Sequence, residues 1–426
     1  MSYQVCIDSL SDEVREKISE ELSINVEVSK YAQFFNAKPK TIELYDLIED
    51  KVILPFSYAV NSLKFKKPKS EKFKKMREEV VYTGVLRENQ VSIKDEAINN
   101  LNKFGACLIS CYPGFGKTST SIYIASKIKL KTLIILNRLM LMDQWVEAIK
   151  KFCPSANVSA IKPNKKNDIL DSDFIIINAI NIQKFGSEFF KDIGTVIVDE
   201  AHLIMSQVLC QSLKYIFPKY VIGLSATPYR PDGLNALMNI YFTEHKIVRN
   251  LKRNHTVYKV NTNFTPEVEY DRNGKVIWGK VLESQCSNPV RNMLIVDIIK
   301  KFDTRIFLVL SKRVEQAQYI YDKLKEAGEK VSLLIKSETE FNKDDRILIG
   351  TTGKVGVGFD HDKLDSLIIA SDLEEYFIQY LGRVFRRTDV EPLIFDLVDN
   401  NSILKKHFST RKKVYEEVGG KIVNYN

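Results

Sequence analysis

The sequence predicts an α/β protein with two tandem parallel-sheet domains, preceded by a small α+β segment. Two series of short, uniformly apolar segments alternate with helical stretches, one over residues 83–248 and one over 292–400. Strands that are apolar throughout are typical of parallel sheets that helices cover on both faces. Residues 1–82 instead show one short amphipathic helix and β-type alternation. A connector over 249–291 and a basic tail over 401–426 complete the expected organisation.

Each α/β series contains five expected strands. In the first series these are 106–109, 132–136, 174–178, 195–198 and 221–224. In the second series they are 306–310, 331–334, 347–349, 366–369 and 393–398. The connector adds two expected strands, at 257–260 and 276–281, on either side of a hairpin turn at 271–274.

Length and composition limit the classes of protein that fit. The 426 residues suffice for two or three domains, and 63 Lys and Arg against 54 Asp and Glu give a net charge of +9. This moderate excess favours a polyanionic partner. We find no signal peptide and no apolar run that could cross a membrane. Six scattered cysteines without metal-ligand spacing indicate free thiols in a reducing, intracellular compartment.

Eight basic residues are concentrated in residues 64–77. A solvated linker or surface strip is the simpler interpretation of such a run. Contact with a phosphate backbone is the alternative.

The segment 111–118 reads Cys-Tyr-Pro-Gly-Phe-Gly-Lys-Thr between an expected strand and an expected helix. Gly114 and Gly116 allow the backbone to curl so that its N–H groups point at phosphate oxygens. Lys117 can reach the outer phosphates, and the Thr118 hydroxyl can hold Mg²⁺. A strict phosphate loop begins with Gly where this chain has Cys111. On this segment alone, a glycine turn without a ligand is the alternative.

Two acidic residues follow the expected strand 195–198. Asp199 stands where a second contact to Mg²⁺ is needed, and Glu200 beside it can orient and deprotonate an attacking water. A surface turn is the alternative for these acids taken alone. Ser225 and Thr227 follow the next expected strand, and their hydroxyls could hydrogen-bond back to the acidic loop, although an ordinary turn also fits.

Arg383 and Arg386 lie three residues apart, which places them on one face of an expected helix. Guanidinium groups supplied across a cleft stabilise the charge on a transferring phosphoryl group. A basic surface helix is the alternative, but the flanking apolar residues argue against full exposure.

Taken together and in order, these motifs resemble those of a superfamily 2 helicase over residues 82–400. Within that superfamily the chain is similar to the branch that holds the XPB-type and UvsW-type DNA helicases and the poxvirus transcript-release helicase. The residues that carry the branch resemblance are 86–90, 144–145 and 356–360, and the segments 111–118, 288–292 and 379–386 look closest to the transcript-release helicase. The family usually has Pro where this chain has Asp362. The resemblance implies that both domains are RecA-like.

The resemblance implies a site for ATP and Mg²⁺. The residues that would bind nucleotide are Gln90 (at the adenine edge), Pro113, Gly114, Phe115, Gly116, Lys117, Thr118, Gly358 and Asp360. Thr118 and Asp199 would hold Mg²⁺, and Glu200 would be the base. Arg386, with Arg383 and Gln379, would supply the finger from the second domain.

A second implied site holds nucleic acid. Asn137 and Arg138 would grip the strand from the first domain, and Thr351 and Thr352 would hold backbone phosphates from the second. His202, Ser225 and Thr227 would couple this site to ATP hydrolysis.

The resemblance implies a monomeric DNA helicase of a large DNA virus that acts in transcription termination or transcript release, with a transcription complex as an expected partner, in the host cell or the virion. Four alternatives stay open: a duplex-DNA translocase in repair or recombination, an RNA helicase, a non-hydrolysing nucleic-acid clamp and a restriction-type translocation subunit. The acids and arginines argue against the clamp, and no evident nuclease cluster supports the restriction subunit.

Overall fold

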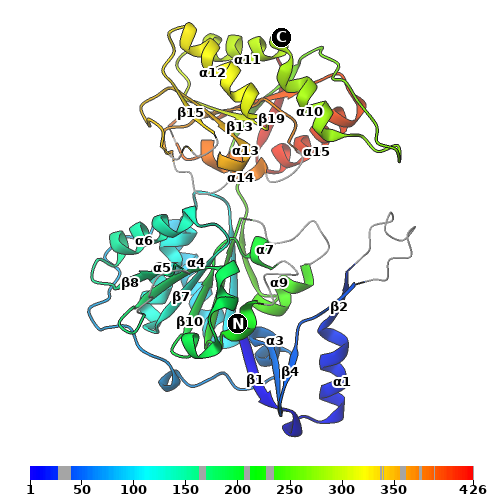
Figure 1. Ribbon diagram of the computed structural model, residues 1–426. Helices are drawn as coiled ribbons and strands as arrows, with labels where there is room; N and C mark the ends of the chain where they lie inside the picture. The colour runs from blue at the N-terminus through cyan, green and yellow to red at the C-terminus, as the bar shows by residue number, and fades with distance from the viewer. Residues whose placement is uncertain are drawn as a thin grey trace. The chain divides into compact units, whose positions relative to one another are not determined.

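A computed structural model describes residues 1–26, 40–162, 169–205, 212–226, 235–335, 338, 340–355, 361–373, 377–387 and 389–425. The chain divides into two compact units, residues 1–111 with 115–249 and residues 112–114 with 250–426. Each unit contains a parallel sheet of seven described strands flanked by helices (Figure 1). The predicted α/β class with two tandem RecA-like domains is therefore confirmed.

The first sheet has the strand order β12-β6-β11-β10-β7-β9-β8. Its strands are β6 (Ala106–Cys111), β7 (Thr132–Leu136), β8 (Val158–Ala160), β9 (Phe174–Asn178), β10 (Thr195–Val198), β11 (Tyr220–Ser225) and β12 (Lys246–Arg249). All five predicted strands of this series are present. The sequence missed β8 and β12, which are edge strands that contain polar residues and so lack the uniformly apolar signature.

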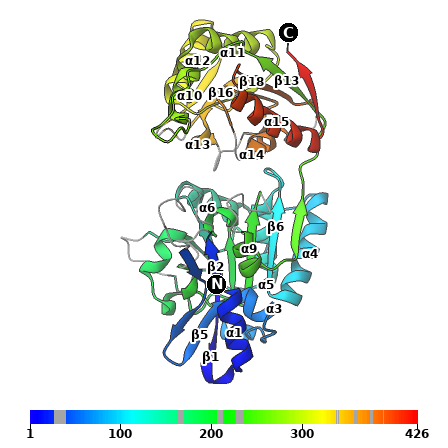
Figure 2. The same cartoon turned by 90° about the vertical axis from the view of Figure 1, so that its right-hand side faces the viewer.

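Helices cover both faces of the first sheet (Figure 1, Figure 2). One face carries α4 (Glu88–Phe104), α5 (Lys117–Ile128) and α6 (Met140–Phe152), and the other carries α7 (Ala201–Ile204) and α9 (Asn235–Phe242). Helix α4 ends at Gly105, whose φ of 73° suits a residue without a Cβ.

The N-terminal residues form an α+β structure, as predicted. Its elements are β1 (Ser2–Cys6), α1 (Asp12–Glu21), β2 (Ser23–Val26), β3 (Lys40–Glu43), β4 (Asp46–Ile48), β5 (Lys51–Pro55) and α3 (Phe56–Asn61). An antiparallel sheet has the order β1-β5-β4, and β2 pairs with β3. Buried Leu54 and Phe56 belong to the same hydrophobic cluster as Val196 and Phe242 of the α/β unit. The expected boundary near residue 82 therefore does not divide two units, because one core spans both parts.

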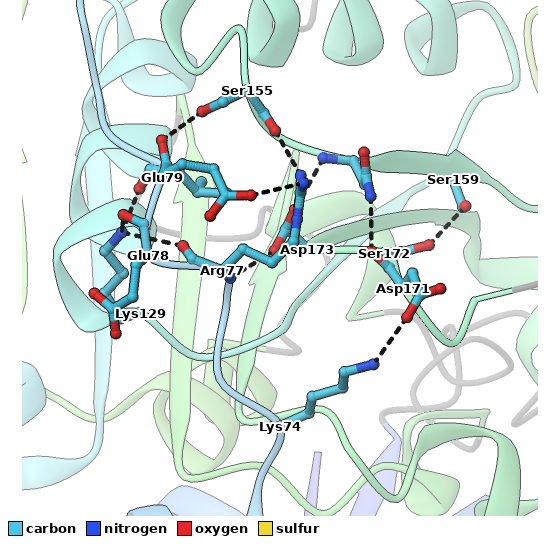
Figure 3. A network of polar contacts seen from close by, with 12 residues as sticks. Lys74, Arg77, Glu78, Glu79, Lys129, Ser155, Ser159, Asp171, Ser172 and Asp173 are labelled. Carbon is cyan, nitrogen blue, oxygen red and sulfur yellow. Dashed lines mark hydrogen bonds and ion pairs between the residues drawn. The ribbon is translucent and has the colours of Figure 1, made fainter.

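The basic run 64–77 ends in a strap that is bound to the first unit (Figure 3). Arg77 donates from Nε and Nη2 to Oδ2 of buried Asp173, at 3.1 and 2.9 Å. The backbone N–H of Arg77 donates to Oδ1 of the same carboxylate at 3.0 Å. Lys74 forms an ion pair of 3.6 Å with Asp171. These two basic residues therefore fasten the strap to protein carboxylates and are neither fully solvated nor directed at a phosphate backbone.

The second sheet has the strand order β15-β16-β14-β17-β18-β13-β19. Its strands are β13 (His255–Asn261), β14 (Phe307–Ser311), β15 (Val331–Leu334), β16 (Ile347–Thr351), β17 (Ser366–Ile369), β18 (Leu393–Val398) and β19 (Gly420–Asn424). The five predicted strands of the second series and the strand at 257–260 are present. Because β13 lies between β18 and β19, the segment expected as a connector supplies a strand of the second sheet, and the expected tail supplies its edge strand.

The strand expected at 276–281 is wrong. An isolated bridge joins Tyr270 to Val276 across the predicted turn, and the chain then enters helix α10 (Trp278–Ser287). Val281, Gln285 and Cys286 are buried on one face of this helix, and their spacing favours a helix over a strand.

The described residues of the second unit form five further helices. They are α11 (Pro289–Lys301), α12 (Val314–Glu326), α13 (Thr352–Val355), α14 (Phe377–Val384) and α15 (Ser402–Glu417). In the first unit, short 3-10 helices occur at Ile7–Ser9, Ser70–Lys72, Ala179–Lys184, Ser187–Phe190 and Leu213–Tyr215. Within the described part of the chain, no helix is long and apolar enough to cross a bilayer.

Candidate active site

The glycine-bearing loop lies between β6 and α5, as the sequence predicts. Gly114 and Gly116 have φ angles of 80° and 96°, which favour glycine. A Cβ at Gly116 would lie 2.4 Å from Gln90 Nε2, so a larger residue there would have to displace the Gln90 side chain. Helix α5 begins at Lys117 and presents its N-terminal N–H groups at the loop, as phosphate sites require. The Lys117 ammonium donates to the carbonyl oxygen of Cys111 at 2.7 Å. Cys111, which departs from the strict motif, thus contacts Lys117 through its backbone carbonyl.

Gln90 is buried against the glycine loop. Its Nε2 donates to the carbonyl oxygen of Gly116 at 3.1 Å and contacts the hydroxyls of Ser119 and Thr120 at 3.0 and 3.1 Å. Its Oε1 accepts from the backbone N–H of Arg87 at 2.8 Å. Gln90 therefore fixes the path of the loop in this structure, and its role at an adenine edge stays a prediction.

Asp199 lies at the carboxyl end of β10, two strands along the sheet from β6. Its Oδ1 accepts from the backbone N–H of Glu200 at 3.0 Å, and its Oδ2 accepts from Trp145 Nε1 at 2.9 Å. Burial, together with the charge of Glu200, raises the pKa of Asp199 to about 6, although the Trp145 hydrogen bond and Lys117 act to lower it. The bond from Trp145 joins residues 54 positions apart, and sequence reasoning missed it.

Glu200 has a φ of 46°, in the left-handed region that a residue with a Cβ rarely adopts. Within the described chain, its buried Oε2 has no hydrogen-bond partner. That atom lies 3.5 Å from Nδ1 of His202. Backbone strain of this kind occurs at functional sites, where the surrounding structure holds it. Glu200 is thus a carboxylate held in place with an oxygen available to accept a proton.

His202 connects the acidic loop to the neighbouring strand. Its Nδ1 lies 2.9 Å from the hydroxyl of Ser225 at the end of β11, and both side chains are buried. The predicted hydrogen bond between Ser225 and the acidic loop is therefore confirmed. Thr227 lies outside the described residues.

Asn137 and Arg138 follow β7 directly, and β7 pairs with β10 in parallel register. They therefore leave the sheet at the same edge as Asp199. The Oδ1 atom of Asn137 is buried and makes no hydrogen bond to the described residues. These two positions suit a nucleic-acid contact near the acids, but that role stays a prediction.

In the second unit, Thr351 ends β16 and Thr352 begins α13. The carbonyl oxygen of Thr352 accepts from the hydroxyl of Tyr380 on α14 at 2.9 Å. The loop with Gly358 and Asp360 lies outside the described residues.

Gln379 and Arg383 belong to α14, but Arg386 does not. The helix ends at Val384, so the prediction that both arginines share a helical face is wrong. The N–H of Phe385 closes the last turn onto Leu381, and the chain then leaves the helix.

The Thr118 hydroxyl and the Asp199 carboxylate are hard oxygen donors, which suit Mg²⁺. No group of three or more His, Cys, Asp or Glu side chains in the described part of the chain could hold a metal alone. A site with few protein donors is typical of Mg²⁺, which substrate phosphates and water help to coordinate. The residues present therefore fit Mg²⁺ bound together with a nucleotide.

The fold and the acidic edge define a nucleotide-hydrolysing enzyme, and comparisons with known proteins identify its class. Residues 83–230 match the family described as "Type III restriction enzyme, res subunit". The chain is 42% identical over 450 residues to "Putative helicase 161L" of Invertebrate iridescent virus 6, with 100% of both chains covered. It is 30% identical over 378 residues to "Putative helicase 055L" of Frog virus 3, covering 87% of this chain and 85% of that one.

Among solved structures, the fold is similar to that of S. cerevisiae Dbp5 bound to RNA and ADP BeF3. The TM-score is 0.56 at 15% identity, and the match covers 78% of this chain and 89% of that one. The chain is a superfamily 2 helicase, an ATPase by class. More particularly, it belongs to the same family as the two viral proteins named above, "Putative helicase 161L" and "Putative helicase 055L".

Proposed function

We propose that this chain is an ATP-driven DNA helicase that separates strands during viral transcription, at termination or transcript release. The strained Glu200 carries the catalytic part of this proposal. Its carboxylate lies beside Asp199, whose two oxygens are already oriented, and beside the hydrogen-bonded pair of His202 and Ser225. Such an arrangement suits a base that must act on one water in a fixed position.

The glycine-bearing loop and the acids after β10 supply the groups that hold ATP. The N–H groups of the loop at 114–118 bind the phosphates, and Lys117 exchanges its bond with the Cys111 carbonyl for one with a phosphate oxygen. Thr118 and Asp199 would hold Mg²⁺, which would supply positive charge to neutralise the transferring phosphoryl group. Glu200 orients the attacking water and accepts its proton at Oε2.

The second unit supplies an arginine finger and some of the residues that contact the nucleic-acid strand. Arg386, with Arg383 and Gln379, stabilises the charge that develops on the phosphoryl group. Gly358 and Asp360 respond to the nucleotide. Alternate closing and opening of the ATP site then moves the strand between two grips, one at Asn137 and Arg138 and one at Thr351 and Thr352.

The choice of DNA and of transcription rests on the resemblance of segments 111–118, 288–292 and 379–386 to the poxvirus transcript-release helicase. The viral relatives and the net charge of +9 support a polyanion-binding motor of viral type. We propose that it works as a monomer in the infected cell.

An ATPase assay with single-stranded DNA, duplex DNA and RNA, joined to fork unwinding, tests the proposal. We expect Lys117→Ala to lower DNA-stimulated turnover at least about 100-fold while strand binding persists. Lys127→Ala, an exposed lysine in the last turn of the same helix, is the matched control. Normal turnover in Lys117→Ala would refute the motor. Stimulation by duplex DNA without unwinding would indicate a translocase, and stimulation by RNA alone an RNA helicase.

A further inference from the structure

We propose that Trp145 is a positioning residue for ATP hydrolysis, because its indole N–H fixes the Asp199 carboxylate for the divalent cation. The inference deepens the proposed function and rests on it, since it assigns Asp199 to Mg²⁺. It also links the nucleotide site to helix α6, which begins just after the predicted strand grip.

The carboxylate of Asp199 is oriented from two sides. Trp145 Nε1 lies 2.9 Å from Oδ2, and the backbone N–H of Glu200 lies 3.0 Å from Oδ1. One donor on each oxygen fixes the rotation of the carboxylate about its Cβ–Cγ bond. Each oxygen keeps a further lone pair for a cation, because an ionised carboxylate can accept about four hydrogen bonds. Outer donors of this kind orient the ligands of metal sites.

Packing alone does not require an indole at this position. Helix α6 buries Leu141, Met142, Trp145 and Ile149 on one face, so an aliphatic or phenyl side chain would also serve the core. The indole differs from those side chains in its N–H, which needs a partner when it is buried. Trp145 is 2% exposed, and its partner is a reacting-site carboxylate rather than a backbone carbonyl.

Helix α6 starts at Met140, two residues after Arg138. A strand bound at Asn137 and Arg138 would therefore touch the segment that leads into the helix. Trp145 stands one and a half turns into the helix and reaches across to the end of β10. A displacement of α6 on strand binding would thus reach Asp199 through a single hydrogen bond.

The test measures how binding of a fluorescent ADP analogue depends on Mg²⁺, without nucleic acid. We expect Trp145→Phe to need about 10–100 times more Mg²⁺ for half-maximal binding, the usual effect of losing an outer donor. Binding without Mg²⁺ should be unchanged. Trp278→Phe, which alters a half-exposed tryptophan of the second unit, should titrate like the wild type.

A second replacement separates the N–H from the shape of the ring. Benzothienylalanine at position 145 keeps the bicyclic ring and lacks only the N–H. The role of the N–H can therefore be measured even if Trp145→Phe folds poorly. A Mg²⁺ titration equal to that of the wild type in this protein overturns the proposal. Failure of the motor would appear elsewhere, as normal turnover in Lys117→Ala, so the two results are distinguishable.

Tryptophan fluorescence gives a second measurement, and its response to Mg²⁺ would not change if Trp145 had only a structural role. The chain contains two tryptophans, so Trp278→Phe leaves Trp145 as the sole indole. We expect its emission to change when Mg²⁺ and ADP are added together, and to change less with either alone. Emission that ignores the cation would contradict a contact between Trp145 and a cation ligand.

Discussion

The two parallel sheets have the same number of described strands, but their carboxyl edges are built differently. In the first unit, that edge carries Glu200 in a strained conformation and an Asp199 whose pKa is raised. In the second unit, the corresponding edge is filled by a buried polar network. The first edge is the one that we propose to be reactive, and buried ion pairs and hydrogen bonds fasten the second; they are called the reactive edge and the rigid edge below.

The network of the second unit is centred on Asp399, which follows β18. Its carboxylate accepts from Arg291 Nε at 2.8 Å and from Gln285 Nε2 at 2.5 Å, and both charged side chains are fully buried. Arg291 also donates to the carbonyl oxygen of Ala370 after β17. These bonds fasten α10 and α11 to the ends of two strands. The segment 288–292, which carries part of the family resemblance, therefore has a structural role here.

The same network continues into the C-terminal helix. Arg411 of α15 donates to both oxygens of Asp396 at 2.8 Å and to Asp372 at 3.0 Å, and all three side chains are buried. The hydroxyl of Tyr415 adds a bond of 2.9 Å to Asp396. The segment expected as a basic tail thus contains a helix of the second unit, because the single arginine of this helix is paired in the interior.

The prediction with the largest expected effect tests whether the second unit contributes a residue to ATP hydrolysis. We expect Arg386→Ala to retain ATP binding and to lose about 10³-fold or more in hydrolysis, as the loss of an arginine finger does. Single-turnover hydrolysis measures it. Arg387→Ala is the control, because Arg387 forms ion pairs with Asp365 and Asp389 and should affect stability more than turnover. Undiminished hydrolysis in Arg386→Ala would contradict the finger.

The second prediction tests the reactive edge. Glu200→Gln keeps the shape of the side chain and removes the base, so we expect turnover to fall about 10²–10⁴-fold with nucleotide binding intact. Glu188→Gln, at an exposed position in the same unit, is the control. If Glu200→Gln hydrolyses ATP at the wild-type rate, another group is the base.

The third prediction tests the rigid edge. Arg291→Met leaves the Asp399 carboxylate buried beside an apolar chain, and we expect the free energy of unfolding to drop by about 3–5 kcal/mol. Urea unfolding monitored by circular dichroism measures the change. The double variant Arg291→Met, Asp399→Leu should recover most of the loss, since it removes both charges. If the single variant is as stable as the wild type, this pair does not hold the edge.

The smallest expected effect is a pH dependence at the reactive edge. The pKa of Asp199 is raised from 3.8 to about 6, so the folded protein holds this proton more tightly than the unfolded chain. Without nucleotide or Mg²⁺, stability should therefore fall as pH rises from 3.8 to about 6, by at most about 3 kcal/mol. Asp199→Asn should flatten this slope. Equal slopes in both proteins would show that Asp199 is not the group responsible.

Local patterns were enough to predict the central strands and the chemical residues. Uniformly apolar segments predicted β6, β7, β9, β10 and β11, because buried parallel strands leave that signature in the sequence. The glycine loop and the acids after β10 were likewise predicted, since phosphate and metal binding need particular residues at short spacing. Edge strands such as β8 and β19 were not, because their half-exposed side chains carry a weaker signal.

The sequence by itself thus determined the two sheets, the order of the motifs and the identity of the acids. Only the tertiary structure decided which distant residues serve them. Trp145 of α6 reaches Asp199 at the end of β10 across 54 residues of chain, and Arg291 reaches Asp399 across 108. Such pairs depend on how helices lie on the sheet, and the hydrophobic periodicity of the sequence does not predict that arrangement. The strained φ of Glu200 likewise arises from the loop that holds it rather than from its own preference.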